Sequence, residues 1–435
     1  MAEDLNIPAP DVAGLVGKST EKNSAGSKAF NPSGKQGHGP IVQLLRGLCF
    51  AVYFWTCCIA IFITQAVGSP LYLINQEWYY AYMAMTKRSF AITTTVMTHL
   101  WGSTTIRISG DETVAGQIRP TADGGVEFKF PERIVLIANH QIYTDWLYLW
   151  WVAYANRPGL HGHIYIILKE SLKYIPIIGW GMMFYSFIFM SRKMATDQPR
   201  MSHRLQKLRK LRTDPQGRTY LDPMWLLLFP EGTNLSGNGR RKSAAWAAKN
   251  DLQDMEHVML PRSTGMFFCL NELKGTLDYV YDCTVAYEGI PRGKFGEELF
   301  GLKSTYFEGK PPKSVNFHWR RFKIADIPLD DPEKFNLWLR EEWYKKDALM
   351  EEYMTNGRFL PWQVPRSITS RPWSRPENPG RSWRSLPSWD LSGCCGIMFA
   401  RCGLSCRLSD SAIIRRYRMR KVQGMERWCI QSRNG

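Results

Sequence analysis

Residues 134–146 place the strongest constraint on the fold of this chain. The first five, 134–138, are apolar and mostly β-branched, and they lie between Pro131 and Asn139. Such a run is typical of a strand buried on both faces of a parallel sheet. Thr144 then fits the N-cap of a helix whose first turn contains Asp145. A strand that leads through a short turn into a helix predicts an α/β fold with a mixed, largely parallel sheet flanked by helices.

The same turn carries His140, five residues before Asp145. Residues i and i+5 lie far apart around one helix, because each residue turns it by about 100°. The two side chains can therefore meet only if His140 lies on the bend before the helix. A histidine held by a carboxylate has a fixed tautomer and can take a proton from a hydroxyl. For an isolated pair, a histidine that merely caps the turn is the more common alternative.

Further polar residues follow other apolar runs. Runs that predict buried strands occupy residues 164–168, 187–190 and 225–229, with later strands at 279–287 and 315–324. Arg192 follows the second run, where its guanidinium suits a phosphate or simply faces water. After the third run come three candidate ligand-binding residues, namely Glu231, Gly232 and Thr233. Ligands bind at the carboxyl ends of strands in open α/β sheets, so neighbouring parallel strands would bring these residues to His140 and favour catalysis.

A charge-free segment, residues 47–76, precedes this region. Residues 47–66 are long enough to cross a hydrocarbon core of about 30 Å. A buried core helix is the alternative, but no polar face interrupts the run. The segment 174–191 also lacks charge, but Pro176 and two glycines favour a membrane-contacting loop and helix over a span.

Charge and composition divide the chain further. The formal charge is +17, and residues 361–435 hold 14 Arg or Lys against 4 acids. We predict a disordered N-terminus at 1–40, a membrane helix at 41–76, a connecting helical region at 77–130, a catalytic domain at 131–358 and a basic, disordered tail at 359–435. Four tail cysteines fit no standard zinc spacing, and a nucleic-acid-binding arm is a weaker interpretation of the tail.

Helices are also predicted at residues 77–108, 199–212 and 333–354. The second is amphipathic and basic, so its cationic face suits either anionic lipid or water. The charged residues of the third are expected to face water. His318 and Arg320 are expected on the polar side of the strand at 315–324.

These motifs together resemble the membrane glycerophospholipid acyltransferase family, of the lysophosphatidic-acid-acyltransferase type. The family's blocks match Asn139-His140-x4-Asp145, residues 187–192 ending in Arg192, Phe-Pro-Glu-Gly-Thr at 229–233, and residues 259–265, expected to start a strand. The likeness extends over residues 40–355. Details such as Leu-Pro-Arg-Ser-Thr-Gly and Asp282-Cys-Thr-Val-Ala-Tyr resemble the lysocardiolipin and lysophosphatidylinositol acyltransferase branch, including its fungal members.

The resemblance implies acyl transfer from acyl-CoA, a co-substrate, to a free hydroxyl of a lysophospholipid in a membrane. His140 would be the general base and Asp145 would orient it. The residues expected to bind substrate are Asn139, Arg192, Glu231, Gly232, Thr233, Pro261 and Arg262. No cofactor, metal ion or nucleic acid is expected, and the endoplasmic reticulum is the expected location. A metal-assisted hydrolase and a membrane-anchored scaffold without catalysis remain alternatives, and the headgroup is left open.

Overall fold

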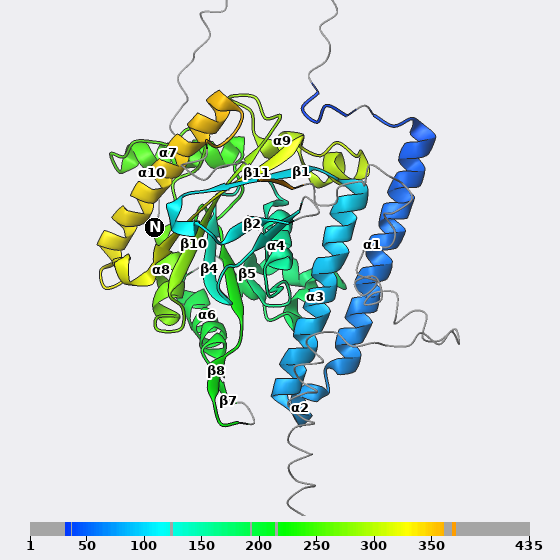
Figure 1. Ribbon diagram of the computed structural model, residues 1–435, viewed down its shortest axis with the longest axis vertical. Coiled ribbons are helices and arrows are strands. Elements are labelled where there is room, and N and C mark those ends of the chain that lie inside the picture. The colour runs from blue at the N-terminus through cyan, green and yellow to red at the C-terminus, as the bar shows by residue number, and fades with distance from the viewer. Residues whose placement is uncertain are drawn as a thin grey trace, which may run out of the picture. The chain divides into compact units, whose positions relative to one another are not determined.

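The computed structural model describes residues 31–35, 37–121, 125–191, 194–213, 216–360 and 368–370 of the 435-residue chain. The elements below belong to the compact unit that begins at Pro32. Its centre is a sheet in the order β12-β1-β11-β10-β4-β9-β5-β6 (Figure 1). These strands are β12 (Ile368–Ser370), β1 (Thr105–Gly110), β11 (Ser314–Lys323), β10 (Tyr279–Tyr287), β4 (Arg133–Ala138), β9 (Met224–Leu228), β5 (Ile164–Lys169) and β6 (Ile188–Met190).

The sheet is mixed but mostly parallel, which confirms the predicted fold class. β10, β4, β9, β5 and β6 run in one direction, while β11 is antiparallel to β10 and β1 is parallel to β11. β10 pairs with β4 up to Cys283 opposite Ala138 and then continues for four residues to Tyr287. The end of β10 therefore runs beside the turn that follows β4, where the histidine lies.

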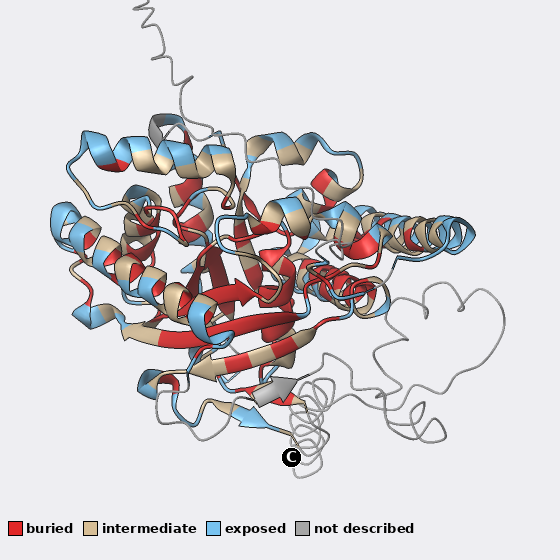
Figure 2. Cartoon of the chain, turned by 90° about the horizontal axis from the view of Figure 1, so that it is seen from above, coloured by how far each residue is buried: buried red, intermediate tan, exposed pale blue. Residues whose placement is uncertain are grey.

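Helices cover both faces of the sheet because its central strands are apolar on both sides. Ile134 and Leu136 of β4 pack in the cluster that includes α4 (Asp145–Ala155). Val135 and Ile137 pack on the opposite face. The helices there are α6 (Met194–Leu208), α7 (Gly237–Lys249), α8 (Ser263–Glu272) and α10 (Pro332–Asn356). Figure 2 shows the sheet as the buried centre between partly exposed helices.

The N-terminal helices form a pair beside α4. α1 (Pro40–Gly68) contacts α3 (Gln76–Trp101) and α5 (Ile178–Phe184). The short α2 (Leu71–Ile74) connects α1 to α3. The Tyr82 hydroxyl donates to the Thr64 carbonyl at 3.1 Å, and the Gln65 amide donates to the Gly181 carbonyl at 3.3 Å. Among the described residues, only Pro40–Ile74 is helical, long and apolar enough to cross a membrane.

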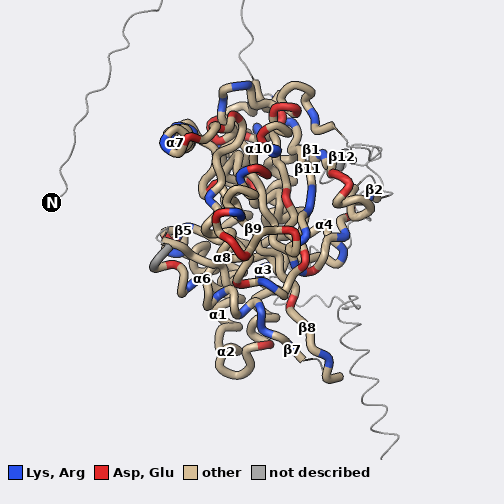
Figure 3. Tube along the Cα trace, turned by 90° about the vertical axis from the view of Figure 1, so that its left-hand side faces the viewer, with Lys and Arg blue, Asp and Glu red and all other residues tan. Residues whose placement is uncertain are grey.

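Smaller elements complete the chain. β2 (Ile118–Pro120) pairs with β3 (Val126–Phe128), and β7 (Leu211–Thr213) pairs with β8 (Thr219–Leu221). Figure 3 marks lysines and arginines in blue on α6 and near the β7–β8 hairpin. Five exposed lysines and arginines lie among the described residues of this stretch, namely Arg200, Lys207, Arg209, Lys210 and Arg218.

Three predicted elements differ in the structure. The helix predicted at 77–108 ends at Trp101, and the one predicted at 199–212 spans Met194–Leu208 and gives way to β7. Asp197 accepts from the amide and hydroxyl of Ser191 at 2.9 and 3.0 Å, which anchors that helix upstream of its proline. Residues 259–262 start no strand. They have no sheet partner, and α8 begins directly after them at Ser263.

Candidate active site

His140 and Asp145 meet at the carboxyl end of β4, as the sequence predicted for a histidine on the bend before the helix. His140 follows β4 in the turn, and Asp145 is the first residue of α4. Nδ1 of His140 lies 2.7 Å from Oδ2 of Asp145. The imidazole keeps 17% of its side-chain surface exposed, whereas the carboxylate is fully buried. A histidine that reaches solvent is thus joined to a carboxylate that is shielded from it.

The Asp145 carboxylate is fixed by more than the histidine. Oδ2 also accepts from the backbone amides of Gln141 and Ile142, at 2.6 and 3.1 Å. Oδ1 accepts from the Tyr287 hydroxyl at the end of β10. Both carboxylate oxygens therefore have hydrogen-bond donors, and the turn that carries His140 is folded around this carboxylate.

These contacts decide the tautomer of His140. An ionised carboxylate only accepts hydrogen bonds, so a neutral imidazole beside it carries its proton on Nδ1. Nε2 is then the nitrogen with the free lone pair. The ring is held further by Phe229, whose centroid lies 4.2 Å away with 23° between the planes. This arrangement suits the abstraction of a proton from a bound hydroxyl.

Asn139 is directed toward the protein. Its amide nitrogen donates to the Val285 carbonyl at 2.9 Å, and its oxygen accepts from the Val285 amide at 2.8 Å. The side chain is fully buried. Asn139 thus pairs like a strand residue with β10 and fixes the start of the turn that carries His140. Its predicted substrate contact stays a prediction, but both polar groups already have partners in the protein.

Glu231 lies beside the pair formed by His140 and Asp145, which we call the dyad. It is buried, with 2% exposure. Its Oε1 accepts from the His140 backbone amide at 3.3 Å. Burial raises the pKa of Glu231 to about 8, against the hydrogen bond from the His140 amide, the nearby Trp343 indole and the charge of Lys346. The carboxyl group joins the turn after β9 to the turn after β4. Through its hydrogen bond with the His140 amide, it holds the backbone of the turn that carries the dyad.

The residues after Glu231 form the open part of this edge. Gly232 is exposed and has φ of +75°, a conformation that favours glycine. A β-carbon there would lie 3.5 Å from Cδ of Arg262, so the arginine passes directly beside the glycine. The Arg262 amide donates to the Pro230 carbonyl at 2.7 Å, which brings the residues around Arg262 to the site. Arg262 is exposed, and Thr233 and Pro261 are half-buried.

Arg192, the remaining predicted substrate-binding residue, lies outside the described residues. β6 ends just before it, at Met190, and pairs in parallel with β5, which itself pairs with β9. Its predicted role therefore stays a prediction. The predicted tail likewise lies mostly outside the described residues, apart from 359–360 and β12 at 368–370.

One group of buried charges was not anticipated. Lys346 of α10 is fully buried and donates to Asp282 Oδ1 at 2.6 Å and to Thr284 Oγ1 at 3.1 Å. Arg320 joins Asp282 at 2.7 Å and Glu342 at 2.8 Å. Burial alone would raise the pKa of Asp282, but the two cations outweigh it and hold the pKa below its usual value.

This network corrects two expectations. Lys346 and Glu342 do not face water, and His318 and Arg320 lie in the interior with 5% and 8% exposure. The reason is that β10 and β11 are covered by α10, so the polar side of these strands meets the charged side of the helix. Burial lowers the pKa of His318 to about 4, which leaves this ring neutral near pH 7. Alternating polarity in a strand shows that one face is polar, but it does not show whether that face contacts water or a charged helix.

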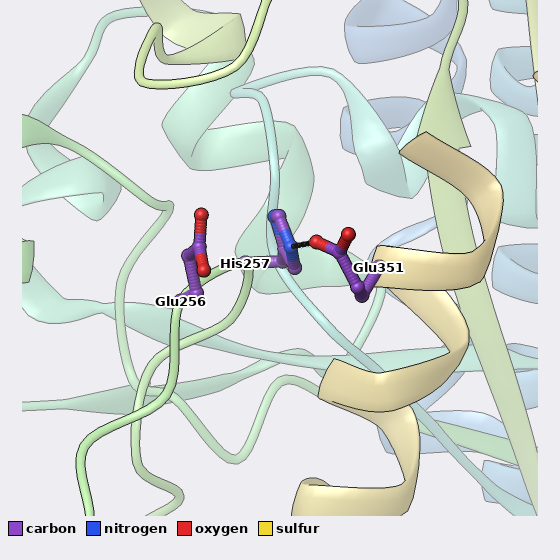
Figure 4. Close-up of side chains that lie close together, drawn as sticks. All are labelled: Glu256, His257 and Glu351. Carbon is purple, nitrogen blue, oxygen red and sulfur yellow. Dashed lines mark hydrogen bonds and ion pairs between the residues drawn. The ribbon is translucent and has the colours of Figure 1, made fainter. Parts of the chain in front are cut away.

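A second charged cluster lies at Glu256, His257 and Glu351, which are close enough to suggest a metal site (Figure 4). Nε2 of His257 lies 2.7 Å from Glu351 Oε2. Arg292 donates to both Glu351 oxygens, at 2.7 and 2.6 Å. The Glu351 carboxylate is thus already paired with a cation. This cluster contains neither His140 nor Asp145 and lends no support to a metal-assisted reaction at the dyad.

Cysteine offers no obvious nucleophile in the sheet or α8. Cys269 and Cys283 are buried, and neither forms a disulfide. Burial raises the pKa of Cys269 to about 12 and that of Cys283 well above its usual value. A thiol that stays protonated is a poor nucleophile.

Comparison of the sequence with known proteins identifies the family to which this chain is similar. The sequence matches the Acyltransferase family model over residues 107–288 and the Acyltransferase C-terminus model over residues 305–378. It is 36% identical to an uncharacterized acyltransferase of Schizosaccharomyces pombe over 72% of this chain and 85% of the relative. It is 37% identical to the 2-acyl-1-lysophosphatidylinositol acyltransferase of Saccharomyces cerevisiae over 73% and 86%. Lysocardiolipin acyltransferase 1 of Gallus gallus is 31% identical over 71% and 74%.

The chain belongs to the acyltransferase family. The predicted resemblance is confirmed, including its likeness to fungal members and to lysophosphatidylinositol and lysocardiolipin acyltransferases. The second family model covers β11 and α10, the elements that carry the buried charges.

Proposed function

We propose that this protein transfers an acyl group from acyl-CoA to a free hydroxyl of a lysophospholipid, with His140 as general base. The observation that carries the proposal is the contact between His140 Nδ1 and Asp145, which directs the lone pair of Nε2 away from the carboxylate. The names of the relatives support a lysophospholipid acceptor. Lysophosphatidylinositol, lysophosphatidylglycerol or lysocardiolipin, and lysophosphatidic acid are the candidate acceptors.

The proposed reaction needs no covalent acyl-enzyme intermediate, because the acceptor hydroxyl attacks the thioester directly. Nε2 takes the acceptor's hydroxyl proton while the hydroxyl oxygen attacks the thioester carbonyl carbon. The tetrahedral adduct then collapses, the carbon–sulfur bond breaks, and the imidazolium returns its proton to the CoA thiolate. The products are the phospholipid ester and CoA. Asp145 stabilises the imidazolium between these two proton transfers.

Cations and backbone at the same edge would bind the anionic acceptor. Arg262 is exposed beside Gly232, where the absence of a side chain allows a phosphate to approach the backbone. Arg192 is expected to act nearby, at the end of β6. We expect Arg192→Ala to raise KM for the lysophospholipid, and Arg192→Lys to restore part of the affinity, because lysine keeps the charge but loses the planar fork.

The alternatives receive less support. A scaffold would need no buried carboxylate saturated with donors beside a partly exposed histidine. In a metal-assisted hydrolase Asp145 would be the natural ligand, but both of its oxygens accept hydrogen bonds from the protein. The expected absence of a metal requirement stays a prediction, which assays with and without a chelator would test.

We also propose that the protein acts at a membrane through α1, with the endoplasmic reticulum as the expected location. α1 presents a stripe of exposed large apolar side chains to its surroundings, including Leu44, Leu48, Val52, Ile59 and Ile63. Lipid is the environment in which such a stripe is stable.

The deciding experiment compares His140→Ala with His203→Ala. His203 is an exposed histidine on α6 and serves as the matched control. Both variants would be purified in detergent and assayed with acyl-CoA and a panel of lysophospholipids. We expect His140→Ala to lose at least 1,000-fold in turnover, since general base catalysis and nucleophile activation are lost together. Near-normal turnover by a folded His140→Ala enzyme would remove His140 from the mechanism.

A further inference from the structure

Tyr287 contacts the dyad from the side opposite His140. Its hydroxyl donates to Asp145 Oδ1, whereas His140 and two backbone amides share Oδ2. Tyr287 is 2% exposed, and its neighbour Val285 on β10 holds Asn139 through both backbone groups. The extension of β10 beyond the end of β4 thus fixes both ends of the catalytic turn.

Resting on the proposed function, we infer that Tyr287 is a positioning residue of the acyl transfer reaction, which acts through Asp145 on the basicity and orientation of His140. A phenol that donates to one carboxylate oxygen withdraws charge from the other. The Tyr287 hydroxyl therefore limits how strongly Asp145 attracts the His140 Nδ1 proton. It also prevents the carboxylate from rotating about its side-chain bonds when the imidazole becomes charged.

The phenol is suited to this role because it stays protonated. Burial and the nearby charge of Asp145 raise the pKa of Tyr287 well above its usual value. The other titratable groups around Asp145 are Tyr148 on α4, Cys283 on β10 and Glu231 after β9, with Lys346 of α10 behind Glu231. Among the described residues, two side chains form hydrogen bonds with the Asp145 carboxylate, namely His140 and Tyr287.

Tyr148 provides the matched control. Its ring lies 6.0 Å from the Tyr287 ring between centroids, and it is equally buried. Its hydroxyl meets no hydrogen-bond partner among the described residues. Tyr148→Phe and Tyr287→Phe therefore remove the same atom from the same environment, but only the second removes a hydrogen bond to Asp145.

We expect Tyr287→Phe to lower kcat about 10-fold, as for a hydrogen bond to a charged group, with little change in KM. Without the phenol proton, Asp145 stabilises the imidazolium of His140 more strongly. The acidic limb of the pH dependence of kcat/KM should then move to higher pH. Tyr148→Phe should change neither quantity. A Tyr287→Phe enzyme with wild-type kcat and an unmoved acidic limb would overturn the inference.

A second substitution keeps the test decisive if Tyr287→Phe fails to fold. Incorporation of 3-fluorotyrosine at position 287 keeps the ring and makes the hydroxyl a stronger donor. We expect the acidic limb to move to lower pH, opposite to the phenylalanine variant, and no movement or the opposite movement would contradict the inference. A wild-type protein without acyl transfer activity would overturn the proposed function, and an active His140→Ala variant would overturn the proposed role of His140. If His140→Ala is inactive while position 287 has no effect on the pH profile, only the present inference fails.

Discussion

α1 and α10 are both long helices, but each differs from the usual relation between composition and burial. The apolar helix α1 is largely exposed, whereas the charged helix α10 buries some of its charges. α1 has no charged residue after Arg46, yet only five of its residues are buried, among them Ile61 and Gln65. α10 is rich in charge, yet it buries Lys346 completely and Glu342 almost completely. Figure 1 places α1 at the edge of the fold beside α3, whereas α10 crosses the sheet.

The difference shows that burial follows the position of a helix on the sheet. A helix that crosses β10 and β11 must match the side chains of those strands, and Asp282 and Arg320 call for charged partners. A helix at the edge packs one face against α3 and leaves the other to the solvent or to lipid. The first arrangement fixes β10 and β11 beside the turn that carries His140, and the second leaves an apolar face exposed.

The largest effect should come from Lys346→Ala. The change leaves Asp282 buried with only Arg320 as cation, and breaking a buried ion pair by removing one partner costs about 3–5 kcal/mol. Chemical denaturation would measure the loss. Lys345→Ala is the control, because Lys345 is 63% exposed, although its ammonium also contacts Glu342 at 2.7 Å. Equal stability of the two variants would show that the buried network contributes little to the fold.

A single charge should separate the two faces of α1. Ile63 is 56% exposed and Ile61 is 7% exposed. A lysine in the membrane interior costs about 2.5–3.5 kcal/mol, so Ile63→Lys should weaken membrane association while the protein stays folded in detergent. Ile61→Lys should instead lower the free energy of unfolding. Carbonate extraction and thermal denaturation would be measured for both, and membrane association unaffected by Ile63→Lys would place α1 outside the lipid.

Glu231 should give the fold a distinctive pH dependence. Its pKa is raised from 4.5 to about 8 in the folded protein, so between these values the folded state binds more protons than the unfolded state. Stability therefore falls as pH rises from about 5 to 8. Glu231→Gln removes this contribution, and the variant should gain about 3–4 kcal/mol relative to the wild type across that range. A constant difference between them would contradict the raised pKa.

The smallest effect should come from truncation after Phe359. The tail after Pro361 carries a net charge of +10, which salt screens over about 8–10 Å. Truncation should leave turnover in detergent nearly unchanged and reduce only the salt dependence of binding to anionic vesicles. The apolar contact of α1 should respond little to salt, which distinguishes the two modes of attachment. A folded but inactive truncated protein would place the last 76 residues within the catalytic unit.

The sequence alone determined the local elements and the central pair of the site. Short apolar runs followed by polar residues marked β4, β5, β6 and β9, because a strand packed on both faces by apolar side chains excludes polar ones. Spacing placed His140 on the bend and Asp145 on the helix, where they meet at 2.7 Å. The helix predicted at 333–354 agrees with α10 (Pro332–Asn356) to within two residues at each end, because Asp331 and Gly357 cap it and capping is a local interaction.

Only the tertiary structure decided which residues from distant parts of the chain meet this pair. Tyr287 lies 142 residues from Asp145, and Asn139 lies 146 residues from Val285. Their contacts depend on β10 being the parallel neighbour of β4 and extending beyond it, and no periodicity reveals strand order. For the same reason Lys346 could be read only as a helix-surface charge, because its partner Asp282 becomes its neighbour when the helix packs on the sheet.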